Sequence, residues 1–512
     1  MNSDVAKADN ESSPCLRTLS LGESELLLDE DPAVLESVNT SRNHRRKPTR
    51  SCCTFLNVGV ADASAHRILV PLYDVLWASS SSGSHVTVDY VVASGSSLRL
   101  ESWTGRVDAT SPSPEAFVST LLARAYGDAR ARKSALVVVN PNSGPGGALA
   151  KWERHVKPLF EAARMTFDVI VLERGGEAAD LAEGIDLLRY DIMVACSGDG
   201  TPHEIFNGLA RRPDAARALS TIAVALIPCG SGNAMACNLY GSHRPALAAQ
   251  AIIKGVVTPL DLVSITQGDR RSVSFLSQAL GIVAESDLAT EHLRWMGSFR
   301  FDVGVFTRLF RRKCYPCDLA VKVEADETLG KNGVRAHYSR HVVDGSPEVG
   351  SPAVDGGLPP LRFGTVQDEL PEGWELIPHD KIGLFYCGNM AYMAPDVNLF
   401  SAALASDGCM DLVLMRGDLW PVTALKTLLS AQKGRLFDNR HVSYRKVSAY
   451  RIIPRGQDDG YISIDGERAP FAPFQAEVHR ALGRVISKRG RFETPGPPGL
   501  ESTGPAEGGD SG

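Results

Sequence analysis

The sequence contains no uninterrupted apolar run of the roughly 18–20 residues that a membrane-spanning helix requires. Its first residues, MNSDVAKADNESSPC, do not combine basic residues with an apolar stretch, so we expect no signal peptide and a cytoplasmic protein. Its 10 cysteines are scattered without a disulfide framework, so reduced thiols are expected. The single CxxC, Cys314 and Cys317, has no partner motif at zinc-site spacing, and metal ligands stay unassigned.

An excess of positive charge is also missing. The chain has 54 Lys and Arg against 60 Asp and Glu, a net charge of −6, which argues against a nucleic-acid partner bound through a basic surface. Neither GxxxxGK[ST] nor GxGxxG occurs at a strand-to-helix turn, which disfavours Walker-type NTPases and NAD dehydrogenases. The sequence does have enough apolar residues for real cores, at 43%, and a glycine content of 47 in 512 that exceeds the usual figure of about 7%.

Composition changes along the chain predict five regions. Polar residues 1–50, with a basic run over 42–50, are expected to be a disordered tail. Residues 53–125 contain short β-branched segments followed by a helical pattern, which indicates a small β-rich extension, with a PH-like fold as one interpretation. The remaining regions are an α/β domain over 130–258, a β domain over 259–488 and a disordered tail over 489–512. The β domain contains a disordered Gly/Pro/Ser-rich insertion at 325–378.

The pattern of apolar residues separates the two central regions. From about residue 133, apolar strands alternate with amphipathic helices in four units, which predicts a doubly wound α/β domain with a parallel sheet. After Pro259, strand-like segments such as KIGLFYCGN and CMDLVLMR predominate, which predicts a mainly antiparallel β domain. The predicted fold class is therefore α/β followed by antiparallel β.

Three glycine-rich turns follow strands of the α/β domain, at residues 140–147, 197–201 and 228–233. The carboxyl ends of parallel strands form the ligand crevice of a doubly wound sheet. Glycine lets backbone N–H groups approach an anion closely, and a helix N-terminus adds a favourable dipole. Tight turns needing positive φ explain any single glycine pair, but three such turns in successive units favour a nucleotide-phosphate site.

The second turn places a carboxylate between two glycines, in Gly198-Asp199-Gly200. Thr201, Pro202 and Glu204 follow in the order of N-cap, N1 and N3, so a helix is expected to begin directly after this turn. Asp199 is then either a turn residue or an ionised carboxylate aimed into the crevice, as a base or a magnesium partner.

Five ordered segments resemble those of a known family: LVVVNPNSG, SGDGTPHEIFNGL, PCGSGNAMA, FLSQALGIVAESDLATEHLRWMGSFRF and YISIDGE. The first three resemble the diacylglycerol-kinase-type catalytic domain, and the last two resemble the lipid-headgroup and late nucleotide-binding segments of sphingosine (long-chain base) kinases. VPLYDVLWA also resembles the β-rich extension of fungal long-chain base kinases. The resemblance implies a β-sandwich lipid half, with the active site between it and the nucleotide half.

Carried over position by position, the resemblance makes Asp199 the catalytic base. It implies nucleotide contacts for Asn140, Pro141, Asn142, Glu204, Gly230, Ser231, Gly232, Arg294, Arg300, Asp465, Gly466 and Glu467. It implies substrate contacts for Ser197, Gly198, Gly200, Ser277 and Asp287. Asp287 corresponds to the carboxylate that pairs with the amino group of the lipid, although a helix-cap role for it stays open.

The implied reaction is phosphorylation of the primary hydroxyl of a sphingoid base by ATP, with Mg²⁺ as cofactor. Such a substrate lies in a bilayer, so peripheral contact with intracellular or plasma membranes is also implied. Three alternatives stay open: a ceramide kinase, a diacylglycerol kinase of the same fold, and a catalytically silent lipid-binding scaffold. Protein partners are not assigned.

Overall fold

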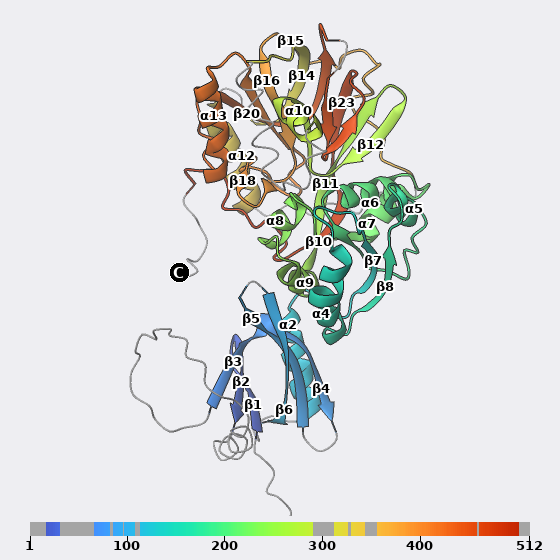
Figure 1. The fold of residues 1–512 in the computed structure, drawn as a ribbon, viewed down its shortest axis with the longest axis vertical. Coiled ribbons are helices and arrows are strands. Elements are labelled where there is room, and N and C mark those ends of the chain that lie inside the picture. The colour runs from blue at the N-terminus through green and yellow to red at the C-terminus, as the bar shows by residue number, and fades with distance from the viewer. Residues whose placement is uncertain are drawn as a thin grey trace, which may run out of the picture. The chain divides into compact units, whose positions relative to one another are not determined.

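The structure, a computed structural model, describes residues 17–30, 66–81, 85–95, 97–107, 113–289, 312–325, 329–343, 356–457 and 460–500. The chain divides into two compact units, Met1–Gly127 and Asp128–Gly512 (Figure 1). Within the described ranges, no helix is both long enough and apolar enough to cross a membrane.

The N-terminal unit is a sheet with one long helix packed on it. Its described strands follow the order β3-β2-β1-β6-β5-β4, and the β1–β6 pair is parallel. The strands are β1 (Arg17–Leu21), β2 (Glu25–Glu30), β3 (His66–Pro71), β4 (Val75–Ser81), β5 (His85–Ser94) and β6 (Ser97–Val107), with a 3₁₀ turn η1 (Leu72–Asp74). Helix α2 (Pro114–Tyr126) is capped by Ser113, and the Tyr126 hydroxyl donates to the Leu76 carbonyl at 2.6 Å.

The expectation that residues 1–50 form a tail is wrong for residues 17–30. These residues form the β1–β2 hairpin, and β2 pairs with β3 far along the chain. Leu19, Leu26 and Leu28 are fully buried. Successive side chains of a strand point to opposite faces, so Leu26 and Leu28 share the core face of β2. Residues 1–16 and 31–50 lie outside the described residues.

The α/β part of the second unit has four parallel strands in the order β8-β7-β9-β10. They are β7 (Ser134–Val139), β8 (Thr166–Val171), β9 (Ile192–Ser197) and β10 (Ala223–Pro228). Strands β9 and β10 are buried along their whole length, as expected for a parallel sheet covered on both faces. The helices are α3 (Ala148–Lys151), a π-helical turn η2 (Trp152–Val156), α4 (Lys157–Ala162), α5 (Glu177–Glu183), α6 (Gly200–Ala210), α7 (Ala215–Thr221), α8 (Ala234–Tyr240) and α9 (Pro245–Lys254).

The rest of the unit is mainly antiparallel. Its strands are β11 (Val256–Gln267), β12 (Arg270–Ser274), β13 (Ser277–Gly281), β14 (Cys317–Val323), β15 (Glu375–His379), β16 (Ile382–Gly388), β17 (Tyr392–Ala394), β18 (Val397–Asn398), β19 (Met410–Arg416), β20 (Val442–Pro454), β21 (Ile462–Ile464), β22 (Glu467–Ala469) and β23 (Phe474–Ser487). Its helices are α10 (Ile282–Ala289), α12 (Lys331–Val343), α13 (Pro421–Leu429) and η5 (Ser430–Lys433).

One hydrogen-bonded sheet connects the two parts. Strand β10 pairs in parallel with β23 at Val224 and Val485, and β23 pairs in the antiparallel sense with β11 and β20. The predicted order of a parallel α/β sheet followed by antiparallel strands is therefore confirmed. The structure adds that the parallel core is extended, rather than followed, by the antiparallel strands (Figure 1).

The predicted disordered insertion, 325–378, is wrong for most of its described residues. It contains α12, the start of β15 and a loop over 356–374 that packs on the sheet. The Glu477 carboxylate accepts hydrogen bonds from the backbone N–H groups of Arg362 and Phe363, and Trp374 is buried. Strand side chains thus satisfy the loop backbone, which composition alone does not reveal. Residues 326–328 and 344–355 lie outside the described residues.

The predicted disordered C-terminal tail, 489–512, is likewise wrong for residues 489–500. The backbone N–H of Glu493 donates to the Asn238 carbonyl at 2.7 Å, and Phe492 is buried. These contacts anchor the segment beside α8 despite its Pro and Gly content. Residues 501–512 lie outside the described residues.

Candidate active site

The three predicted glycine turns lie against one another at the carboxyl ends of β7, β9 and β10. A Cβ added to Gly230 would lie 2.5 Å from the Cα of Gly198, and one added to Gly144 would lie 2.8 Å from the Cys229 carbonyl oxygen. No side chain fits at either distance. Glycine is therefore required for the turns to touch, in addition to any role in letting backbone approach an anion.

Polar side chains hold these turns in place. Asn233, in the left-handed region at φ 55°, accepts from the Gly230 N–H and donates to the Gly230 carbonyl, both at 2.8 Å. The Ser143 hydroxyl accepts from the Gly198 N–H at 3.3 Å, and the Asn140 side-chain oxygen accepts from the Asn142 N–H at 3.0 Å. The predicted nucleotide residues Asn140 and Asn142 thus belong to the same rigid group of turns as Gly230.

Asp199 lies where the second and third turns meet. Its half-buried carboxylate accepts from the backbone N–H groups of Ala234 and Met235, each at 3.0 Å. An added Cβ on Gly232 would lie 3.3 Å from Asp199 Oδ2, so the third turn passes directly over this carboxylate. Burial raises the pKa of Asp199, the two backbone hydrogen bonds oppose that rise, and the charge of Asp465 adds to it. The geometry holds the carboxylate in one orientation.

Helix α6 starts two residues earlier than the capping pattern, with Pro202 as its first helical residue, predicts. It begins at Gly200, with Asp199 at the N-cap position, and Thr201 is a buried residue within the helix. Thr201 is therefore not the N-cap. Its hydroxyl accepts a hydrogen bond from the side-chain amide of Asn140 at 3.4 Å. The shift places Asp199 directly at the N-terminus of the helix.

A tight hairpin brings a distant part of the chain to the start of α6. Ile464 pairs with Glu467, which leaves Asp465 and Gly466 as a two-residue turn with φ values of 53° and 87°. Positive φ at both positions is the geometry that such two-residue hairpins favour. An added Cβ on Gly200 would lie 2.9 Å from Glu467 Oε1, so this hairpin contacts the first turn of α6.

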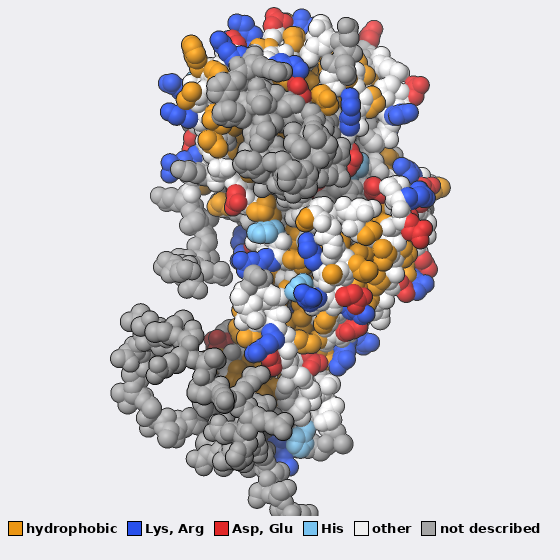
Figure 2. All heavy atoms as spheres, in the orientation of Figure 1, with side chains coloured by type: hydrophobic (Ala, Val, Ile, Leu, Met, Phe, Trp, Pro, Cys, Tyr) orange, Lys and Arg blue, Asp and Glu red, His pale blue; other side chains and the backbone are white. Residues whose placement is uncertain are grey.

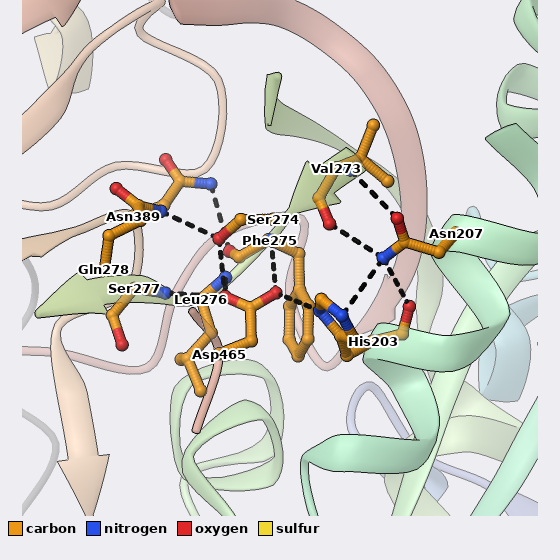
Figure 3. Close-up of polar contacts among 10 residues, drawn as sticks. All are labelled: His203, Asn207, Val273, Ser274, Phe275, Leu276, Ser277, Gln278, Asn389 and Asp465. Carbon is orange, nitrogen blue, oxygen red and sulfur yellow. Dashed lines mark hydrogen bonds and ion pairs between the residues drawn. The ribbon is translucent and has the colours of Figure 1, made fainter. Parts of the chain in front are cut away.

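The carboxylate of Asp465 is a buried hub of hydrogen bonds (Figure 3). It accepts from the Ser274 hydroxyl, from the backbone N–H groups of Phe275, Leu276 and Ser277, and from His203 Nδ1, at distances from 2.5 to 3.1 Å. Both of its oxygens are thus used by protein donors. In this arrangement Asp465 positions the β12–β13 junction and α6, while Glu467, two residues on, keeps an exposed carboxylate.

His203 links this hub to α6. Its Nδ1 lies 2.8 Å from Asp465 Oδ2 (Figure 3). Burial lowers the pKa of His203, but the hydrogen bond and the charge of Asp465 outweigh it, and the pKa is raised overall. Asn207, one turn on, accepts from the Val273 N–H at 3.0 Å and donates to the Val273 carbonyl at 2.8 Å. Sequence reasoning missed both residues, although their i, i+4 spacing places them on one helix face.

The structure brings most of the predicted residues to this place. Ser197 is buried at the end of β9, and Ser277 is buried at the start of β13, next to Asp465. Pro141, Glu204 and Ser231 lie on the same turns and on α6. Asp287 lies in α10, but its side chain is outside the described part of the structure, as are residues Arg294 and Arg300 entirely.

The exposed carboxylate of Glu467, beside the first turn of α6, is the type of ligand that a Mg²⁺–nucleotide complex uses. Magnesium keeps several waters and uses one or two protein carboxylates together with phosphate oxygens. A second cluster within the described residues, His337, Asp407 and Cys409, has ligand atoms within 4.8 Å of one another. There the Lys446 ammonium lies 2.7 Å from Asp407 Oδ2, so a positive charge already occupies that site.

Comparisons with known proteins show the family of this chain. Residues 134–265 match the family described as "Diacylglycerol kinase catalytic domain", and residues 13–127 match a domain of unknown function. The chain is 30% identical over 430 residues to "Sphingoid long chain base kinase 4" of Schizosaccharomyces pombe, covering 83% of this chain and 89% of that protein. It is 30% identical over 356 residues to human "Sphingosine kinase 1", covering 67% of this chain and 88% of that protein.

A third relative is "Sphingoid long chain base kinase 5" of Saccharomyces cerevisiae, 33% identical over 430 residues. That alignment covers 73% of this chain and 62% of the yeast protein, which is less than two thirds of its length. The matched catalytic region identifies a lipid kinase domain of the diacylglycerol kinase type. The chain belongs to the sphingosine (sphingoid long chain base) kinase family.

Proposed function

We propose that this protein transfers the γ-phosphate of ATP to the primary hydroxyl of a sphingoid long-chain base, such as sphingosine, sphinganine or phytosphingosine. The observation that carries the proposal is the position of Asp199, where two glycine turns and the N-terminus of α6 meet. Support for the substrate class comes from relatives named for sphingoid bases, which align over most of the chain.

In the proposed reaction, Asp199 accepts the proton of the lipid hydroxyl while the oxygen of that hydroxyl bonds to the γ-phosphorus of ATP. The bond from the γ-phosphorus to the oxygen that bridges to the β-phosphate breaks, and ADP leaves with the electron pair. Phosphoryl transfer depends mainly on positioning and on neutralising charge. The two N–H groups that hold the Asp199 carboxylate keep it oriented for this step. Bound Mg²⁺ supplies charge neutralisation on the phosphate oxygens.

Asp287 is the proposed partner of the substrate ammonium group. A sphingoid base carries a positive charge near its reacting hydroxyl, whereas diacylglycerol and ceramide carry none. An Asp287 carboxylate near the reacting hydroxyl would therefore favour the sphingoid base over both neutral lipids. We extend the proposal to the setting of the reaction: the enzyme contacts membranes peripherally, because its substrate lies in a bilayer.

The test is a kinase assay with ATP on sphinganine, ceramide and diacylglycerol in mixed micelles. We expect stoichiometric ADP and a phosphorylated long-chain base from sphinganine, with little product from the two neutral lipids. Phosphorylation of ceramide without phosphorylation of sphinganine would overturn the substrate assignment. No turnover of any lipid would favour a silent scaffold.

A further inference from the structure

Helix α13 carries apolar side chains on both of its faces. On the inner face, Ala424, Leu425 and Leu428 pack against the hydrophobic cluster of the antiparallel part. On the outer face, Val422 is 59% exposed and Leu429 is 44% exposed, at positions i and i+7 of one helical stripe. Core packing explains the inner face and leaves the outer apolar stripe unexplained.

Trp420, the residue before α13, is another exposed apolar side chain on this element. Its side chain is 74% exposed. Among the exposed large hydrophobic residues that the structure describes, no other aromatic side chain is as exposed. Its indole lies beneath the guanidinium of Arg312, at 5.8 Å from the ring centroid. Tryptophan with an adjacent cation is typical of surfaces at the membrane–water interface, where one part of the side chain is apolar and another is wet. We call Trp420, Val422 and Leu429 the α13 tip.

Cations lie near the Trp420 end of the α13 tip. Arg416 and Lys381 pair with Asp418 at 2.6 and 3.2 Å, and Asp418 also accepts from Arg312 through its carbonyl. Next to them is a groove of about 720 Å³, with an apolar floor that includes Leu319, Leu412 and Leu414. Its rim carries Lys381, Arg416, Arg440 and Arg445. These cations, with Lys426 on the outer face of α13, outnumber the neighbouring carboxylates of Asp380 and Asp418. In Figure 2, hydrophobic and basic side chains lie side by side at the upper left, where Figure 1 places α13.

We propose that the α13 tip and the basic rim of the groove dock on a bilayer that contains anionic phospholipid. This inference rests on the proposed function, because a kinase of bilayer lipids must meet its substrate at a membrane. Apolar insertion and attraction to anionic headgroups are the two contributions that together give stable peripheral binding. The α13 tip supplies the first contribution and the rim cations supply the second.

The sheet topology leaves the nucleotide turns accessible in this docked state. In β16, Ile382 pairs with Arg416 beside the α13 tip, whereas Gly388 pairs with Ser277 beside Asp465. The two ends of this strand lie roughly 20 Å apart at about 3.3 Å per residue. A second copy of the chain is a less suitable occupant, because a two-fold interface would bring two copies of the same positively charged surface together.

The experiment is sedimentation of the full chain with phosphatidylcholine vesicles, with and without phosphatidylserine, in the absence of substrate. We expect binding that requires phosphatidylserine and weakens with salt. Trp420→Ser should lower partitioning roughly tenfold, since a large apolar side chain no longer inserts. Arg440→Glu should lower it at least roughly fivefold. The matched control is Leu188→Ser, which removes a 95% exposed leucine from the α/β part and should bind like the wild type.

Turnover of a short-chain, water-soluble sphingoid base separates this inference from the proposed function. All three variants should phosphorylate the soluble base at the wild-type rate, which also shows that they fold. If Trp420→Ser and Arg440→Glu both bind vesicles as the wild type does, the docking surface is wrong. It is also wrong if Trp420→Ser abolishes a dimer of the chain and leaves vesicle binding unchanged. Vesicle binding that depends on Trp420, in a chain that phosphorylates no sphingoid base, would overturn the proposed function and keep the docking surface.

Discussion

At the scale of single residues, the candidate site depends on carboxylates with different surroundings. Asp199 is held by two backbone N–H groups and stays half-buried, whereas Asp465 is fully enclosed by five donors. A carboxylate with all its lone pairs engaged is a positioning group, and one that still faces the turns is suited to proton transfer. The resemblance found in the sequence assigned both carboxylates to the same site. Only the hydrogen bonds in the structure show that their roles differ.

Asp199→Asn should lower kcat by roughly 10²–10⁴, because the amide cannot accept the hydroxyl proton. The amide keeps one oxygen for the two N–H groups, so we expect a moderate stability loss of about 1–3 kcal/mol and a folded protein. Thermal unfolding and single-turnover assays check both points, with Asp269→Asn, an exposed aspartate, as the control. Normal turnover by Asp199→Asn would remove this residue from the role of base.

Asp287→Asn should raise KM for sphinganine by roughly tenfold, because a charge-assisted hydrogen bond to the ammonium group becomes neutral. The kcat at saturating lipid should change much less. Steady-state kinetics at varied sphinganine and fixed ATP measure this split. An unchanged KM would indicate that Asp287 serves α10 structurally.

His203→Gln should show a stability loss that depends on pH. Because the folded-state pKa of His203 is raised, its protonation stabilises the fold fully below about pH 6.5, the unfolded value. This stabilisation is lost as the pH rises through the raised pKa. Urea unfolding at several pH values measures the free energy of unfolding. We expect it to be about 1–3 kcal/mol lower for the variant than for the wild type at low pH, with a smaller difference at high pH. His243→Gln, at an exposed histidine, is the control. A difference in the free energy of unfolding that does not depend on pH would contradict the ion pair between His203 and Asp465.

At the scale of elements, the glycine turns are packed so closely that they tolerate no added side chain at the points of contact. Sequence reasoning placed all three turns at the carboxyl ends of the correct strands, since apolar strands and amphipathic helices alternate clearly there. It weighed phosphate approach against tight turns that need positive φ. It did not foresee that the turns touch, because contact between turns separated by tens of residues is a tertiary property. The start of α6 was misplaced for a related reason: Thr201 and Pro202 match a capping pattern, but Thr201 contacts Asn140 instead.

Gly230→Ala should destabilise the protein by about 1–3 kcal/mol and raise KM for ATP, because the new methyl group meets the Gly198 backbone at 2.5 Å. Gly175→Ala is the matched control, since an added Cβ there meets open space and its φ is not positive. We expect the free energy of unfolding of this control variant to lie within about 1 kcal/mol of the wild-type value. Equal stability and equal KM for the two variants would show that the turns are loosely packed.

At the scale of the whole molecule, a single sheet runs from the nucleotide turns to the α13 tip. The pairing of β10 with β23 joins parallel and antiparallel parts, and this contact spans more than half of the chain in sequence. Local patterns predicted both parts but not their junction. The β1–β2 hairpin and the loop over 356–374 were missed because their partners are distant: β3 for the hairpin, and Glu477, Arg451 and Gln475 for the loop.

The most direct measurement of the proposed function is phosphate transfer from ATP to sphinganine, compared in one assay with ceramide and diacylglycerol. The proposed roles of Asp199 and Asp287 predict a phosphorylated long-chain base from sphinganine, loss of that product in Asp199→Asn, and little reaction of the neutral lipids. Efficient phosphorylation of ceramide or diacylglycerol without reaction of sphinganine would contradict the proposal.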